Sequence, residues 1–62
     1  MHYLATIKYS LTDSYCKSFD VEKDAQDWLD RKNNNMEYTT IISKADNNWN
    51  VIDSYVYTQG DE

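Results

Sequence analysis

Few side chains in this chain of 62 residues could do chemistry. Nucleophilic catalysis needs a Ser, Thr or Cys within reach of a base, and the single histidine, His2, is expected as a solvated residue on the outer side of a strand. The single cysteine, Cys16, has no neighbours in sequence that would make it a thiolate, so we expect a small buried apolar group. The sequence predicts no catalytic residues and a protein that is not an enzyme.

Metal and cofactor sites are not predicted either. A zinc site needs several Cys or His ligands, and this chain offers only His2 and Cys16. The acidic residues lack the D-x-D-x-D-G spacing of a calcium loop, and one glycine, Gly60, cannot build a phosphate-binding loop. Paired carboxylates that act as acid and base need a walled cleft, for which so short a chain has little room. We expect no metal and no cofactor.

The charge balance restricts the partners. Eleven acidic against six basic residues give a formal net charge of −5, the wrong sign for neutralising phosphates, so no direct nucleic-acid binding is expected. This balance suits a basic protein partner, although it also serves solubility alone. A lone cysteine and an N-terminal segment without a signal-peptide pattern indicate a cytoplasmic protein. No apolar stretch approaches the roughly 20 residues that cross a membrane.

The pattern along the chain predicts one compact domain, residues 1–62, with two hairpins around one helix. Residues 2–10 and 15–19 read as strands joined by a turn at 11–14, because apolar and polar residues alternate. Asp20 is predicted to cap a helix over 21–32, with Val21, Ala25, Trp28 and Leu29 forming one apolar stripe. The runs 37–44 and 49–58 are rich in β-branched and aromatic residues and flank a turn at 45–48. The predicted fold class is α+β, an antiparallel ββαββ sheet with one helix packed on one face and residues 59–62 as a frayed tail.

Aromatic residues supply the first candidate binding surface. Six Tyr, two Trp and one Phe exceed what a core under one helix can hide. In the last predicted strand, Ile52 and Val56 share one side, and we expect them beneath the helix because compact aliphatic side chains suit that contact. Trp49, Tyr55 and Tyr57 share the other side. They are predicted to form an exposed aromatic face of the kind enriched in interface hot spots.

Acidic residues on the helix supply the second candidate surface. At 100° per residue, four aspartates lie on the side opposite the apolar stripe: Asp20, Asp24, Asp27 and Asp30. Such a row resembles the phosphates of DNA, which some proteins imitate to occupy basic grooves. Lys23 and Arg31 lie on the same ridge and partly neutralise it, so an ordinary solvated helix face is the other interpretation.

Residues 14–32, SYCKSFDVEKDAQDWLDRK, contain the pattern F-[D/T]-x-x-x-x-A-x-x-W/Y-L. This segment resembles the strand-to-helix step in the arm-site DNA-binding domains of phage-type integrases and in other small phage proteins. Those domains have an Arg-rich sheet, whereas Tyr, Thr, Asn and Ser dominate the strands here, so the resemblance implies the layout without DNA binding. Size, acidity and layout are also similar to small phage proteins that disable host enzymes, including host RNA polymerase inhibitors and some anti-CRISPR proteins.

These patterns predict a small acidic protein-binding module. The leading hypothesis is a phage or mobile-element protein that binds and inhibits a host nucleic-acid-handling protein through the aromatic face or the acidic helix. The alternative is a structural module that forms a homodimer through its open sheet face or an edge strand and has no inhibitory role.

Overall fold

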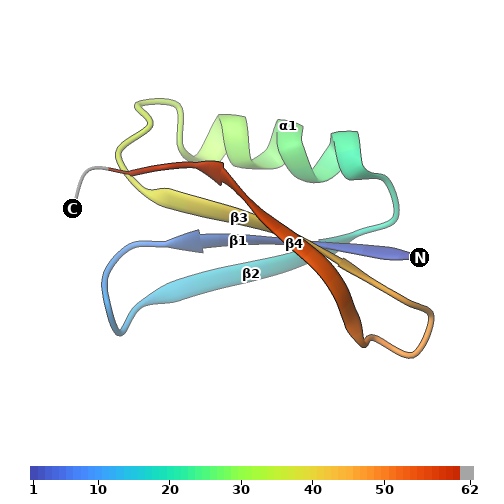
Figure 1. The fold of residues 1–62 in the computed structure, drawn as a ribbon. Helices are drawn as coiled ribbons and strands as arrows, with labels where there is room; N and C mark the ends of the chain where they lie inside the picture. The colour runs from blue at the N-terminus through green and yellow to red at the C-terminus, as the bar shows by residue number, and fades with distance from the viewer. Residues whose placement is uncertain (61–62) are drawn as a thin grey trace.

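Four antiparallel strands and one helix make up residues 1–60, the part of the chain that the computed structural model describes. The strands form a single sheet in the order β2-β1-β3-β4, and the helix lies on one face of it (Figure 1). This arrangement confirms the α+β class and the ββαββ order. The elements are β1 (His2–Lys8), β2 (Ser14–Phe19), α1 (Glu22–Lys32), β3 (Thr39–Ala45) and β4 (Val51–Thr58).

The helix connects two strands that are not neighbours. β2 and β3 both run antiparallel to β1 and flank it, so α1 crosses over β1 on its way between them. This crossover leaves β1 and β3 in the centre of the sheet and β2 and β4 at its edges. It also holds the helix over the β2-β1-β3 side, while β4 lies beyond it.

The core is the contact between the helix and the two central strands. Trp28 and Leu29 of α1 are buried against Ile7 of β1 and Ile42 of β3, with two alanines, Ala5 and Ala25, allowing close approach. Four half-buried aromatics surround this cluster: Tyr3, Phe19, Tyr38 and Tyr57. Each fully buried large apolar side chain contributes about 1.5–3 kcal/mol, so a cluster this small makes every member important.

The start of the helix differs from the sequence-based expectation. Val21, not Asp20, is the N-cap: its backbone is extended and its carbonyl accepts the first helical bonds, from Asp24 N at 3.1 Å and Ala25 N at 3.3 Å. A capping side chain must belong to this residue, and Val21 has no side-chain oxygen. The prediction that Asp20 caps the helix is therefore wrong. Val21, predicted in the apolar stripe, is exposed because it precedes the helix.

The connection from the helix to β3 is closed by a buried amide. Asn33 Nδ2 donates to the Tyr38 carbonyl at 2.8 Å, and the Tyr38 N–H donates to Asn33 Oδ1 at 3.0 Å. Asn33 thereby satisfies both backbone groups of the residue that precedes β3. The helix predicted over 21–32 ends just before this asparagine, but its bonds to Tyr38 were not predicted.

The C-terminal segment packs against the same connection. Gly60, expected in a frayed tail over 59–62, donates its N–H to Thr39 Oγ1 at 3.0 Å. A Cβ at position 60 would lie 2.4 Å from the Tyr38 carbonyl carbon, so only glycine allows this approach without a shift of the backbone. Asp61 and Glu62, the rest of that predicted tail, lie outside the described residues.

Replacing Asn33 with alanine should destabilise the fold by about 2–3 kcal/mol, because the Tyr38 N–H and carbonyl lose their partner in a part-buried site. Urea unfolding followed by Trp fluorescence measures the change. Asn34→Ala is the matched control, since Asn34 is exposed and surface substitutions usually stay within about 0.5 kcal/mol. Equal effects of the two substitutions would contradict the role assigned to Asn33.

Replacing either of two adjacent threonines with valine should change the free energy of unfolding, in opposite directions at the two positions. The buried Thr40 Oγ1 has no hydrogen-bond partner within the described residues, so Thr40→Val should raise the free energy of unfolding by about 1 kcal/mol. Thr39 Oγ1 accepts the bond from Gly60, so Thr39→Val should lower it by about 1 kcal/mol. Chemical unfolding of both variants checks the prediction, and a stability loss in Thr40→Val would refute it.

Candidate binding surfaces

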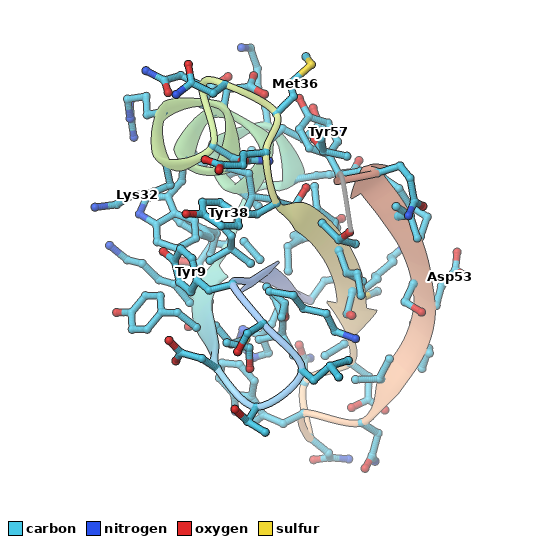
Figure 2. All side chains as sticks on the ribbon, turned by 90° about the vertical axis from the view of Figure 1, so that its left-hand side faces the viewer. Tyr9, Lys32, Met36, Tyr38, Asp53 and Tyr57 are labelled. Carbon is cyan, nitrogen blue, oxygen red and sulfur yellow. The ribbon has the colours of Figure 1, made fainter. Side chains whose placement is uncertain are left out.

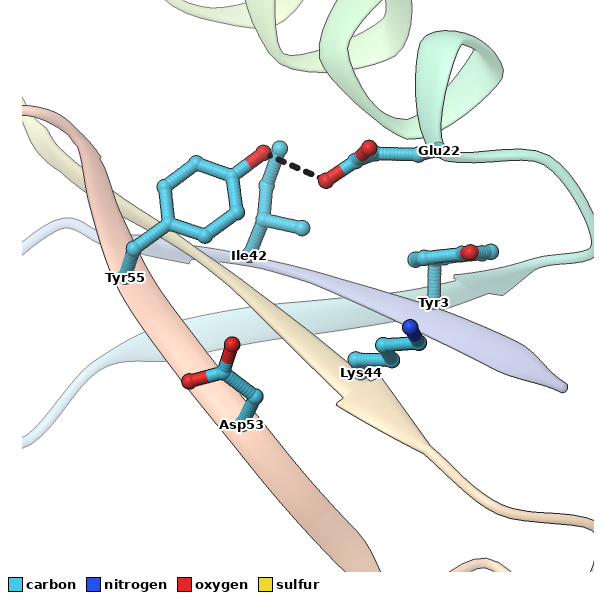
Figure 3. Close-up of a pocket in the computed structure, with 6 residues that line it drawn as sticks. All are labelled: Tyr3, Glu22, Ile42, Lys44, Asp53 and Tyr55. Carbon is cyan, nitrogen blue, oxygen red and sulfur yellow. Dashed lines mark hydrogen bonds between the residues drawn. The ribbon is translucent and has the colours of Figure 1, made fainter.

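Two tyrosines of β4 connect the edge strand to the helix. The Tyr55 hydroxyl donates to Glu22 Oε2 at 2.9 Å (Figure 3) and accepts from Gln26 Nε2 at 3.0 Å. The Tyr57 hydroxyl donates to Asp30 Oδ1 at 3.0 Å, and Figure 2 shows this side chain between β4 and the helix. Tyr55 and Tyr57 were predicted to lie on the open face of the sheet. The predicted face is wrong, because both rings lie on the helix side, but the predicted exposure of Tyr55 is confirmed, at 40%.

The reason lies in the position of β4. The helix covers the other three strands, so a short aliphatic side chain on β4 cannot reach it, whereas a phenol can. Glu22, Gln26 and Asp30 follow one another at four-residue spacing and form a polar stripe on the flank of α1 that meets these phenols. Ile52 and Val56, predicted beneath the helix, are instead 56% and 54% exposed.

Trp49 is separated from the two tyrosines with which it was grouped. It lies in the turn before β4, with a φ of 66° in the left-handed region, and its ring stacks on His2 with centroids 3.8 Å apart. The turn is held by Asp46 Oδ1, which accepts from Asn48 N at 2.9 Å and Asn50 N at 3.0 Å. Both bonds lower the pKa of Asp46, and the bond from the Asn50 N–H has the larger effect. His2 lies on the outer side of β1, as expected, but the stacking leaves it half-buried rather than fully solvated.

The four aspartates of the predicted acidic ridge differ in their contacts. Asp27 pairs with Lys23 at 3.3 Å, and Asp30 accepts the Tyr57 hydroxyl. Asp24 is exposed, and the Asp20 side chain is 94% exposed, 3.9 Å from His2 Nδ1. The helix does not present four equivalent free carboxylates, so the likeness to a row of phosphates is weak.

A small pocket opens between the first turn of the helix and the β3–β4 pair. It measures about 150 Å³ and is lined by Tyr3, Glu22, Ile42, Lys44, Asp53 and Tyr55 (Figure 3). Two carboxylates and one ammonium share this space, but Glu22 already accepts the Tyr55 hydroxyl. Across residues 1–60, no group of three or more His, Cys, Asp and Glu residues is placed to hold a metal ion.

The face of the sheet opposite the helix is open (Figure 1). The strand register places two rows of side chains across it, because directly paired residues share a face. One row runs from Leu4 through Ser43 to Ser54, and the other runs from Thr6 through Ile41 to Val56. Ile52 lies on the same side as Ser54, two residues away. We call Leu4, Ile41, Ile52 and Val56 the aliphatic patch.

The open face is also nearly free of charge. Within the described chain, its strand residues carry hydroxyl, thiol and aliphatic side chains, the His2 imidazole and the Lys8 ammonium, but no carboxylate, since Asp53 lies on the helix side. Cys16, which was expected to be buried, is exposed on this face. Sequence reasoning missed the aliphatic patch because both sides of β4 contain apolar residues and the helix was assigned to the wrong one. The alternation of Leu4 and Thr6 with the core residues of β1 was the available signal.

Comparisons with protein-family models, with curated proteins and with solved structures find no match to this chain. Among residues 1–60, no helix is both long and apolar enough to cross a membrane.

Alkaline pH should weaken the attachment of β4 to the helix. Partial burial is the main cause that raises the pKa of Tyr55; the Gln26 bond lowers it, and contact with Glu22 raises it further. Partial burial and the bond to Asp30 raise the pKa of Tyr57. A group whose pKa is higher in the folded state contributes stability below its unfolded pKa of about 10 and loses it as pH rises through the folded value. The free energy of unfolding should therefore fall above pH of about 10.

The double variant Tyr55→Phe/Tyr57→Phe should show a smaller alkaline loss of stability, because phenylalanine does not ionise. Urea unfolding at a series of pH values provides the measurement. Tyr15→Phe is the control, since Tyr15 is exposed on β2, away from the polar stripe of the helix. An alkaline loss of the same size in all three proteins would rule out this explanation.

Proposed function

We propose that this protein is a protein-binding module that docks through the open face of its sheet. The observation that carries the proposal is the pair Ile52 and Val56, more than half exposed on an edge strand and on a face that no other element covers. Apolar side chains that lie together on a surface mark sites of association. The surrounding serine and threonine hydroxyls supply hydrogen-bonding groups for a polar rim.

Binding to this face differs from binding to the acidic helix in its chemistry. A partner that covers the aliphatic patch is held by removal of apolar surface from water, so added salt weakens the complex little. A basic partner on the helix would be released by salt. Bonds already made by Asp27 and Asp30 favour the sheet face. A phage origin and the inhibition of a host nucleic-acid-handling protein stay predictions from the sequence.

The test compares capture of a partner by three immobilised proteins from a lysate of the native host, with identification by mass spectrometry. Ile52→Lys/Val56→Lys should reduce capture at least tenfold, because burying each aliphatic side chain contributes about 1.5–3 kcal/mol. Asp20→Asn/Asp24→Asn, which changes exposed carboxylates that do not bond to β4, should capture as much as the wild type. Loss of capture in the aspartate variant alone would move the site to the helix. Absence of any partner, a second copy of this chain included, would defeat the proposal.

A further inference from the structure

We infer that the pocket beside the first turn of the helix binds a guanidinium group, carried by an arginine side chain or by a small free molecule. The pocket lies on the helix side of the sheet, so it is separate from the open face proposed above as the docking surface. Its volume is about 150 Å³, and a cavity of that volume holds a molecule of the size of benzene. Ethylguanidinium is a ligand of about that size, so the planar group and the start of its alkyl stem have room.

The inner part of the pocket is apolar and aromatic. Ile42, 1% exposed, lies between the rings of Tyr3 and Tyr55 (Figure 3). Aromatic faces attract cations, and arginine is found over them more often than lysine. A guanidinium is also more weakly hydrated than an ammonium, so it loses less hydration when it enters such a site.

Two carboxylates face this space from different elements. Glu22 belongs to the first turn of α1, and Asp53 belongs to β4. The Tyr55 hydroxyl uses Glu22 Oε2, and the Ser54 N–H donates to Asp53 Oδ1 at 2.9 Å. Within residues 1–60, Glu22 Oε1 and Asp53 Oδ2 accept no hydrogen bond and stay available. Acceptors on two sides suit a guanidinium, whose N–H groups point outward in one plane.

Lys44 supplies the positive charge of the pocket. It is paired with Asp53 across β3 and β4, yet no ion pair within 4.0 Å joins it to a carboxylate of the described residues. Two carboxylates and one ammonium give the lining a formal charge of −1, which one guanidinium neutralises. The positive end of the helix dipole also lies here, and Glu22 and Asp24 in the first turn offset it. Lys44 therefore weakens the binding of a cation without preventing it.

Binding of the isolated group is weak because the site is open to water. Glu22 and Asp53 are exposed, and attractions between exposed charges are small and screened by salt. Together with the contact to the aromatic rings, they give ethylguanidinium a Kd on the order of 10 mM. In a larger ligand, the pocket would position one basic group and would not hold the whole ligand alone.

NMR titration with small molecules tests the site on the wild-type protein. Ethylguanidinium chloride, added at constant ionic strength, should shift a set of backbone amide resonances along saturable curves: those of Glu22, Ile42, Lys44, Asp53 and Tyr55. Ethylurea, a neutral analogue of the same shape, should not shift them. Ethylammonium should bind more weakly, because a compact, strongly hydrated ammonium does not present donors to both carboxylates in one plane.

Two variants should change the affinity in opposite directions. Asp53→Asn removes one carboxylate and should weaken ethylguanidinium binding about two- to fivefold, and Lys44→Gln removes the competing ammonium and should strengthen it by a similar factor. The matched controls are Asp13→Asn and Lys8→Gln, which make the same changes of charge at exposed positions outside the pocket. Both controls should bind as the wild type does. The amide spectrum of each variant shows whether it is folded.

N-acetylarginine amide distinguishes the source of the group. Binding at least as tight as that of ethylguanidinium would assign the pocket to an arginine of a polypeptide, and its exclusion would assign the pocket to a small free guanidine. Equal shifts with ethylurea would overturn the inference, as would wild-type affinity in both Asp53→Asn and Lys44→Gln. Amide shifts of the same size around Asp13 would reduce the binding to general attraction by an acidic protein. Tighter binding of ethylammonium would refute the choice of a guanidinium.

Discussion

One helix of eleven residues has to stabilise a sheet of four strands, and the rest of the structure follows from that mismatch. The helix can bury one apolar stripe, and it places Trp28 and Leu29 against β1 and β3 because the crossover from β2 to β3 holds it there. β4 receives no aliphatic contact from the helix. The strand is kept in the fold by its ladder to β3 and by two phenol groups that reach the polar flank of α1. Backbone pairing and tyrosine hydroxyls thus replace a hydrophobic layer at this edge.

Tyrosine suits this position because it combines reach with a polar tip. Its ring packs over the sheet, and its hydroxyl ends at a helix carboxylate, so a partly solvated gap is bridged without burying an unpaired group. The same geometry explains the composition. Many of the aromatic residues that looked surplus to a small core serve as spacers around it: Tyr57 and Tyr38 line the cluster, and Tyr38 meets Tyr9 edge to face at 4.9 Å (Figure 2). Four aromatic side chains still stay exposed, but they lie in separate parts of the fold: Tyr9, Tyr15, Trp49 and Tyr55.

The sequence predicted the fold class and the strand order along the chain because alternation and the Ala25–Trp28–Leu29 spacing are local signals. It failed where a choice depended on three-dimensional distance. Both sides of β4 contain apolar residues, so only the gap between helix and edge strand decides that Tyr55 faces inward and Val56 outward. The two hydrogen bonds between Asn33 and the Tyr38 backbone were missed for a related reason. Its partner is the backbone of Tyr38, and no side-chain pattern marks a residue whose backbone needs an acceptor and a donor.

The uncovered face couples binding to stability. A chain of about 60 residues buries only about 60% of its unfolded surface, and here part of the aliphatic content, Ile52 and Val56, stays in water. Any partner that binds the folded state through these side chains stabilises the fold by mass action, since the unfolded chain does not present them as one surface. Covering β4 would protect the element with the weakest attachment to the helix. One helix covers only one face of a four-stranded sheet. A partner on the open face would therefore add the second layer that a single helix cannot provide.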